Sequence, residues 1–122
     1  MFPLAFPPSV YLCTRPVDFR KAFDGLCGEV RDYLKRDPLD GSLFVFYNKR
    51  RDRLKILLWD NDGFWLFYKR LEIGTFQLPR TETLHTAHAI SAEQLHLILS
   101  GIDLRSIRHR KRYNRKKLLA RP

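Results

Sequence analysis

Three strand-like runs in the middle of the chain, at residues 42–48, 53–59 and 64–71, constrain the fold most. Two short turn-forming sequences separate them, at residues 48–52 and 60–63. Asn and Asp side chains bond their own backbone in turns, and Gly accepts positive φ. Strand-like runs that are joined by such short turns predict an antiparallel meander.

Both faces of this predicted sheet are apolar. In the first run Leu43, Val45 and Tyr47 would face one way. Phe44 and Phe46 alternate with them and would face the other way. Apolar faces need cover, so we expect one face to pack on a first helix. The other face needs a second helix, the N-terminal segment or another subunit.

The first predicted helix begins after Asp18 as its N-cap and carries an apolar stripe over residues 19–34. It would end near Pro38. Gly25 and Gly28 lie inside it, and each lowers helix stability by about 1 kcal/mol relative to Ala. The helix is therefore expected either to pack very closely there or to break into two pieces.

A second helix is predicted after residue 90. Ser91 and Gln94 have the spacing of a capping box, and the apolar stripe follows over residues 95–102. Gly101 would end this helix or lie in its last turn. Three other segments are assigned more simply: residues 10–13 as a short strand, residues 75–78 as a further strand-like run, and residues 79–90 as a loop.

These elements predict an α+β fold, with an antiparallel meander of three to five strands packed with two helices. One domain would cover residues 1–104, beginning with a Pro-rich segment at residues 1–9. Residues 105–122 would form a disordered or helical basic tail. We expect no membrane span and no signal peptide, and we expect Cys13 and Cys27 to be reduced in the cytoplasm.

The net charge of +10 is concentrated in the tail. Residues 1–104 carry 14 basic residues and all 13 acidic residues, so they are nearly neutral. A basic block of this kind favours a polyanionic partner such as nucleic acid, although a merely solvated tail is the alternative. The tail cations are Arg105, Arg108, Arg110, Lys111, Arg112, Arg115, Lys116, Lys117 and Arg121.

A second basic feature lies on the predicted hairpin and at the end of the third run. Its cations are Lys49, Arg50, Arg51, Arg53, Lys55, Lys69 and Arg70. A hairpin tip with several cations can contact phosphates, and Arg can also read guanine edges. The alternative is an ordinary charged hairpin that protects a sheet edge. If the strands pair in order, Lys55 and Lys69 are expected on the same face.

The aromatic side chains of Trp59 and residues 64–68 have two interpretations. They could form a stacking platform for single-stranded nucleic acid. At this density in adjacent strands, however, aromatic residues more often form core. We expect core for most of them, with at least one of Trp59 and Trp65 largely buried.

Catalytic and metal-binding patterns are weak. Asp60, Asp62 and Glu72 are the carboxylates that a metal-dependent nuclease would have to bring together, but the first two belong to an ordinary turn sequence. No Gly-rich phosphate loop is present. We therefore expect no enzymatic activity, no metal and no cofactor. The possible metal ligands lack the usual spacing: Cys13, Cys27, His85, His88, His96 and His109.

Several separated segments of the chain occur in the order that is typical of one known family. They are residues 10–26, 43–46, 50–57, 59–64, 68–72 and 95–103. In this the chain resembles the TnpB accessory proteins of insertion-sequence family 66, which are distinct from the much larger RNA-guided nucleases of the same name. The resemblance implies a companion protein encoded beside a separate transposase, and it carries over no catalytic residue. The basic tail lies outside these segments.

The leading expectation is a non-catalytic accessory protein for DNA transposition that binds DNA through the basic hairpin and tail. Its expected partners are DNA, the transposase of the same element and other copies of the chain. The second hypothesis is an adaptor whose apolar sheet face docks on the transposase or on itself. The third is a small metal-dependent nuclease.

Deleting residues 105–122 should separate the first two hypotheses. Each phosphate that a protein neutralises on duplex DNA contributes a slope of about −0.9 to the salt dependence of affinity. A tail-dependent DNA binder should therefore lose much of its affinity and of its salt dependence in fluorescence anisotropy. An adaptor should still capture the transposase in a pull-down. Unchanged DNA affinity after the deletion would show that the tail makes no contact.

Overall fold

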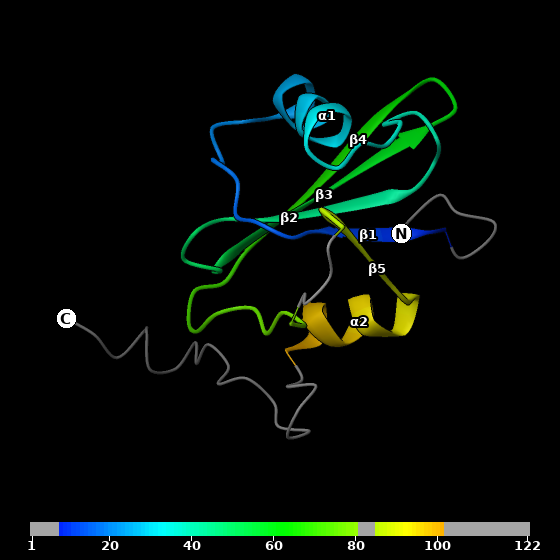
Figure 1. Cartoon of the computed structure of the whole chain (residues 1–122). Helices are drawn as coiled ribbons and strands as arrows, with labels where there is room; N and C mark the ends of the chain where they lie inside the picture. The colour runs from blue at the N-terminus through cyan, green and yellow to red at the C-terminus, as the bar shows by residue number, and fades with distance from the viewer. Residues whose placement is uncertain (1–7, 81–84, 102–122) are drawn as a thin grey trace.

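The computed structural model describes residues 8–80 and 85–101, so the basic tail and the first seven residues lie outside it. The elements are β1 (Val10–Cys13), α1 (Phe23–Asp32), β2 (Leu43–Tyr47), β3 (Arg53–Asp60), β4 (Gly63–Arg70), β5 (Ala87–Ile90) and α2 (Ala92–Ser100). They form a five-stranded sheet in the order β4-β3-β2-β1-β5, with α1 and α2 on opposite sides (Figure 1). The predicted α+β class is confirmed. No helix in this part of the chain has the length and apolar character needed to cross a bilayer.

The sheet contains the predicted meander together with two further strands. β2, β3 and β4 pair antiparallel in chain order, as the turn sequences predicted. β1 pairs parallel with β2 and antiparallel with β5, so the sheet is mixed. Parallel neighbours need a crossover connection, and α1 supplies it between β1 and β2.

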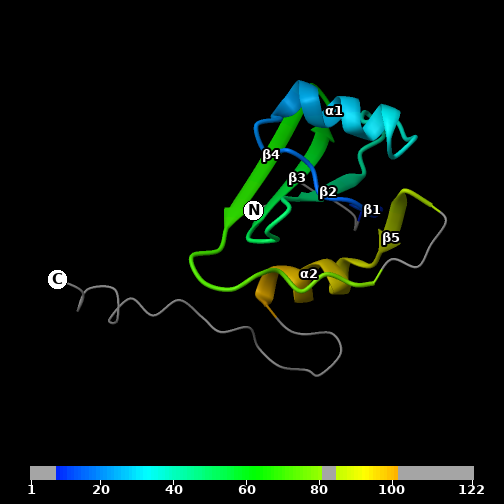
Figure 2. The same ribbon diagram turned by 60° about the vertical axis from the view of Figure 1, so that its left-hand side comes forward.

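β2 is buried on both faces, as its sequence predicted. All five of its residues are buried. Phe44 and Phe46 belong to the apolar cluster that includes Leu26 and Val30 of α1. Leu43, Val45 and Tyr47 belong to a second cluster, which includes residues of α2. The turned view also shows the two helices on either side of the strands (Figure 2). Of the three covers that were considered for the second face, the second helix is therefore the correct one.

The first helix is shorter than predicted. It begins at Phe23 rather than directly after Asp18, and it ends at Asp32 rather than near Pro38. The Asp18 carboxylate accepts a hydrogen bond from the Arg20 N–H at 2.9 Å, so it stabilises a turn that precedes the helix. The helix is continuous through both glycines. A Cβ atom at Gly25 would lie 2.9 Å from the Lys21 Cβ, so close packing is the correct alternative at that position.

Two segments between β4 and α2 differ from the prediction. The expected loop at residues 79–90 contains β5, which pairs with β1. Residues 75–78, expected to be strand-like, belong to no strand. Phe76 anchors this stretch instead, because its N–H donates to the Arg51 carbonyl at 2.7 Å and its side chain is 1% exposed. Local sequence missed both features because they depend on contacts with distant residues.

The capping box of the second helix is confirmed. Ser91 Oγ accepts a hydrogen bond from the Gln94 N–H at 3.0 Å, and the Gln94 side-chain oxygen accepts one from the Ser91 N–H at 2.8 Å. Gly101 ends the helix in the left-handed conformation, with φ of 79°. Both ends of α2 therefore have the partners that unpaired backbone groups require.

Replacing Ser91 by Ala should lower the free energy of unfolding by about 1 kcal/mol, since the first turn of α2 loses its cap. Ser91→Asp is the matched control and should retain most of the stability, because Asp is also a good N-cap. Urea denaturation of the full chain measures both. Equal stability of wild type and Ser91→Ala would show that the capping box does not stabilise the fold.

Candidate nucleic-acid interface

The cations of the β2–β3 turn and those at the end of β4 lie at one end of the sheet. Arg53, the first residue of β3, is the register partner of Arg70, the last residue of β4. A hydrogen bond of 2.7 Å from the Leu71 N–H to the Asp52 carbonyl also joins the two segments. We call this the basic end, defined by Lys49, Arg50, Arg51, Arg53, Lys69 and Arg70.

Asn48 fixes the shape of the β2–β3 turn. Its side-chain oxygen accepts hydrogen bonds from the Asp52 N–H at 3.1 Å and the Arg53 N–H at 3.0 Å. Its amide nitrogen donates to the Asp52 carboxylate at 2.6 Å, so that carboxylate is occupied inside the turn. The turn therefore holds its backbone without help from Lys49 or Arg50. Both of these residues are exposed, and no side-chain partner is recorded for them among the described residues.

Arg51 and Arg53 flank the tip and lie beside tyrosines. Arg51 has a φ of 59°, and its guanidinium carbon lies 5.8 Å from the centroid of the Tyr47 ring. The guanidinium of Arg53 donates to the Tyr68 hydroxyl at 3.2 Å. These contacts orient the two guanidinium groups and leave their charge without a carboxylate partner among the contacts described. Such groups are suited to binding an anion.

Lys55 does not fit the phosphate contact that the sequence suggested. Its side chain is 4% exposed, and its ammonium donates to the carbonyls of Phe19 at 2.9 Å and Lys21 at 2.7 Å. The ring of Tyr68 lies 5.0 Å from the ammonium nitrogen. Burial lowers the pKa of Lys55, and the charge of neighbouring Arg53 lowers it further. Lys55 is therefore a structural cation beneath the crossover segment.

Lys55 and Lys69 also lie on opposite faces of the sheet, which corrects the expected placement. Lys55 is the register partner of Tyr68, whereas Lys69 is the partner of Leu54. Because side chains alternate along a strand, this one-residue offset separates the two ammonium groups. Lys69 instead reaches α2, where it donates to the Leu99 carbonyl at 3.0 Å.

Arg70 is also partly neutralised. Its guanidinium lies 2.8 Å from the Glu72 carboxylate, and both side chains are more than half exposed. An exposed ion pair of this kind contributes little stability and exchanges partners readily. Arg70 can therefore turn to another anion, while Lys49 and Arg50 need not leave any partner.

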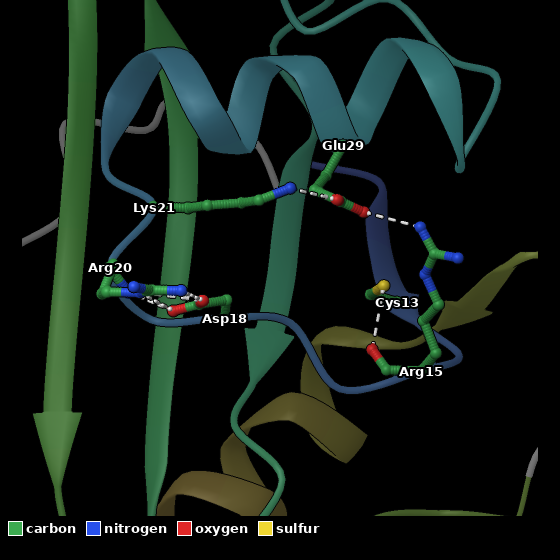
Figure 3. Close-up of polar contacts among 6 residues, drawn as sticks. All are labelled: Cys13, Arg15, Asp18, Arg20, Lys21 and Glu29. Carbon is green, nitrogen blue, oxygen red and sulfur yellow. Dashed lines mark hydrogen bonds and ion pairs between the residues drawn. The ribbon is translucent and has the colours of Figure 1, made fainter.

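Further cations that sequence reasoning did not single out lie between β1 and α1 (Figure 3). Glu29 accepts hydrogen bonds from Lys21 at 2.6 Å and Arg15 at 3.3 Å. Burial raises the pKa of Glu29, but these two hydrogen bonds outweigh it and the pKa is lowered. Arg20 pairs with Asp18 in the same way, and the side-chain hydrogen bond lowers the Asp18 pKa to about 2. These cations are occupied in structural ion pairs.

The opposite end of the sheet carries carboxylates. We call it the acidic end, defined by Asp60 at the end of β3, Asp62 in the β3–β4 turn and Asp40 before β2. Asp60 accepts a hydrogen bond from the Trp65 indole at 3.1 Å. Glu72 follows β4 at the basic end. The eight residues of β4 therefore separate it from Asp60 and Asp62, by roughly 26 Å for an extended strand. The carboxylates of Asp60, Asp62 and Glu72 do not converge on one ion.

The other candidate metal ligands are also dispersed. Within residues 8–80 and 85–101, no three His, Cys, Asp or Glu side chains are grouped to hold a metal. Cys13 and Cys27 are buried free thiols, and burial raises the pKa of both. The Cys13 thiol donates to the Arg15 carbonyl at 3.2 Å (Figure 3). His109 and the predicted tail contacts, from Arg105 to Lys117, lie outside the described residues.

Similarity to known proteins extends over most of the chain. The family model described as "IS66 Orf2 like protein" matches residues 8–109. The chain is similar to the uncharacterized protein y4hO of Sinorhizobium fredii, with 42% identity over 105 residues, covering 86% of this chain and 90% of that protein. It is also similar to the uncharacterized protein y4jC of the same organism, with 40% identity over 96 residues, covering 77% and 79%. No solved structure matches the chain.

Replacing Lys55 by Met should lower the free energy of unfolding by about 1–3 kcal/mol, because two carbonyls lose their donor. The matched control, Lys49→Met, removes an exposed charge and should change stability by less than about 0.5 kcal/mol. Urea denaturation measures both variants. Equal stability of the Lys55→Met variant and the wild type would contradict a structural role for this ammonium.

Proposed function

The chain belongs to the IS66 Orf2-like family of transposition-associated accessory proteins, and on that premise we propose that it assists transposition by binding DNA at the basic end of its sheet. In this proposal the protein carries out no chemical step itself. It positions DNA, while the transposase of the same element supplies the chemistry. The basic tail adds affinity that does not depend on sequence.

The observation that supports the proposal is a group of cations at one end of the sheet, where those at the turn tip make no described contact that stabilises the fold. Lys49 and Arg50 are exposed at the tip of a turn that Asn48 already holds. The nearest carboxylate in that turn, on Asp52, is bonded to the Asn48 side chain. A rigid turn with unpaired cations can meet phosphates without first breaking its own ion pairs, which favours binding.

The geometry suits contact with the phosphate backbone. β2 and β3 are internal strands of the sheet, so only the exposed turn between them would reach the DNA, and its Lys and Arg side chains would contact backbone phosphates. Arg51 and Arg53 extend the same surface toward β4, with tyrosine rings beside them. Arg70 would join after exchanging Glu72 for a phosphate, which costs little for an exposed pair. Lys55 has no part in this surface.

The two alternative functions receive less support. An adaptor that docks through an apolar sheet face would need an uncovered face, but α1 and α2 each pack on one. A metal-dependent nuclease would need Asp60, Asp62 and Glu72 to converge, and β4 separates them. The exposed aromatic side chains of β4, Trp65 and Tyr68, lie at a sheet edge and not on a sheet face.

The double variant Lys49→Glu/Arg50→Glu should weaken DNA binding and reduce the salt slope by about 2, because each lost phosphate contact removes about 0.9. The matched control is Arg31→Glu/Lys35→Glu, which makes the same change of charge at exposed positions in and after α1. The control should bind more tightly than the hairpin variant. Fluorescence anisotropy across a salt series measures both proteins.

The probes are one duplex that carries the terminal repeat of the element and one scrambled duplex. Equal loss of affinity in the hairpin and control variants would mean that only net charge matters, and the proposed interface would be wrong. Preference of the wild type for the terminal repeat at ~200 mM salt, where purely electrostatic binding weakens sharply, would identify end recognition.

A further inference from the structure

β4 is an edge strand of the sheet, and its centre is apolar and uncharged. β4 has eight residues and pairs with β3 alone among the described strands. Its centre, residues 64–68, reads Phe-Trp-Leu-Phe-Tyr and contains neither a charge nor a proline. Trp65 and Tyr68 are each 49% exposed, so these two are not the core residues that the sequence suggested, whereas Phe64 and Phe67 pack against the core. Trp59 is only partly buried. Natural proteins normally protect such an edge with charges, prolines or bulges, because it can pair with another strand.

We propose that a second copy of this chain pairs with β4 through an antiparallel β4–β4 contact centred on Leu66. In this register Leu66 lies opposite Leu66 of the second copy. Trp65 lies opposite Phe67 of the second copy, and Phe64 lies opposite Tyr68. Aromatic residues directly opposite each other are favourable cross-strand pairs. The two five-stranded sheets then form one continuous sheet.

The charges at the two ends of β4 support an antiparallel arrangement. The turn before β4 carries Asp60 and Asp62, and the strand ends with Lys69 and Arg70. In the register centred on Leu66, Arg70 lies opposite Asp62 of the second copy, and symmetry repeats this contact. A parallel arrangement would place like charges together. Opposite charges in register are favourable, whereas like charges are unfavourable.

Symmetry also limits the assembly to two copies. An isologous contact uses the same surface on both partners, so each copy uses its single β4 edge and leaves none for a third. A two-fold axis perpendicular to the sheet keeps α1 on one side and α2 on the other in both copies. The apolar clusters beneath the helices therefore stay covered. β5, the other edge of the sheet, has only four residues and is a poorer template.

The pairing has a consequence for DNA binding, and this consequence alone rests on the proposed function. In an antiparallel pair the two basic ends point away from each other along the joined sheet. One dimer would thus present two separate DNA-binding surfaces, each without Arg70, because the dimer contact occupies that guanidinium group. An accessory protein of this kind could hold two DNA segments at the same time, whereas a monomer would hold one.

The experiment that tests the pairing measures the mass of the full chain in a dilution series without DNA, so that failure of DNA binding cannot affect it. Analytical ultracentrifugation should show a monomer–dimer equilibrium. Asp62→Arg alone and Arg70→Asp alone should each raise the dimer dissociation constant by roughly tenfold, about 1.4 kcal/mol. The double variant Asp62→Arg/Arg70→Asp restores opposite charges and should return the constant toward that of the wild type. A monomer at every concentration, or no rescue in the double variant, would overturn the proposal.

A disulfide test checks the register. Antiparallel partners have Cα atoms about 4.5–5.5 Å apart, which lies within the range for a disulfide. Leu66→Cys should therefore cross-link under mild oxidation. Phe64→Cys is the matched control, because the two copies of residue 64 would lie roughly 13 Å apart along the strands. The native thiols of Cys13 and Cys27 are buried. Cross-linking through residue 64 rather than residue 66 would also contradict the proposed register.

Discussion

The two-sided burial of β2 is the constraint on which the rest of the structure depends. A strand with apolar side chains on both faces needs cover on both, so the sheet must lie between two layers. The chain supplies the first layer with the crossover α1 and the second with α2, which packs back after β5. Once both faces are covered, the ends and edges of the sheet are the surfaces left for binding. The proposed DNA contact uses an end, and the proposed dimer contact uses an edge.

Lys55 explains why the first helix starts late. Its buried ammonium needs acceptors, and it finds them in the carbonyls of Phe19 and Lys21. In a helix that began at Asp18, the Phe19 carbonyl would already accept a bond from the N–H four residues later. The segment before Phe23 therefore has to stay non-helical and lie over β3. A charge inside a strand thus shapes the crossover, because a buried cation without partners is far more costly than a shorter helix.

Much of the fold could be predicted from local sequence, and the failures share one cause. The β2–β4 meander, the Ser91 cap and the Gly101 end of α2 depend on neighbouring residues, so spacing and turn chemistry were sufficient. β5 was missed because its four residues are held by pairing with β1, more than 70 positions earlier. The candidate site shows the same division. The exposed hairpin cations were found by charge, whereas the burial of Lys55 depends on the crossover, which sequence alone does not place.

The distribution of cations also separates stability from binding. Lys55 is held by main-chain carbonyls, and Arg15 and Lys21 share Glu29, so these three charges stabilise the crossover beside β1. Lys49 and Arg50 stabilise nothing that the structure describes, and their repulsion is a small cost to the fold. Their value lies in the rigid turn beneath them. Since the Asn48 side chain already fixes that turn, a phosphate could bind both cations without the entropic cost of ordering the loop.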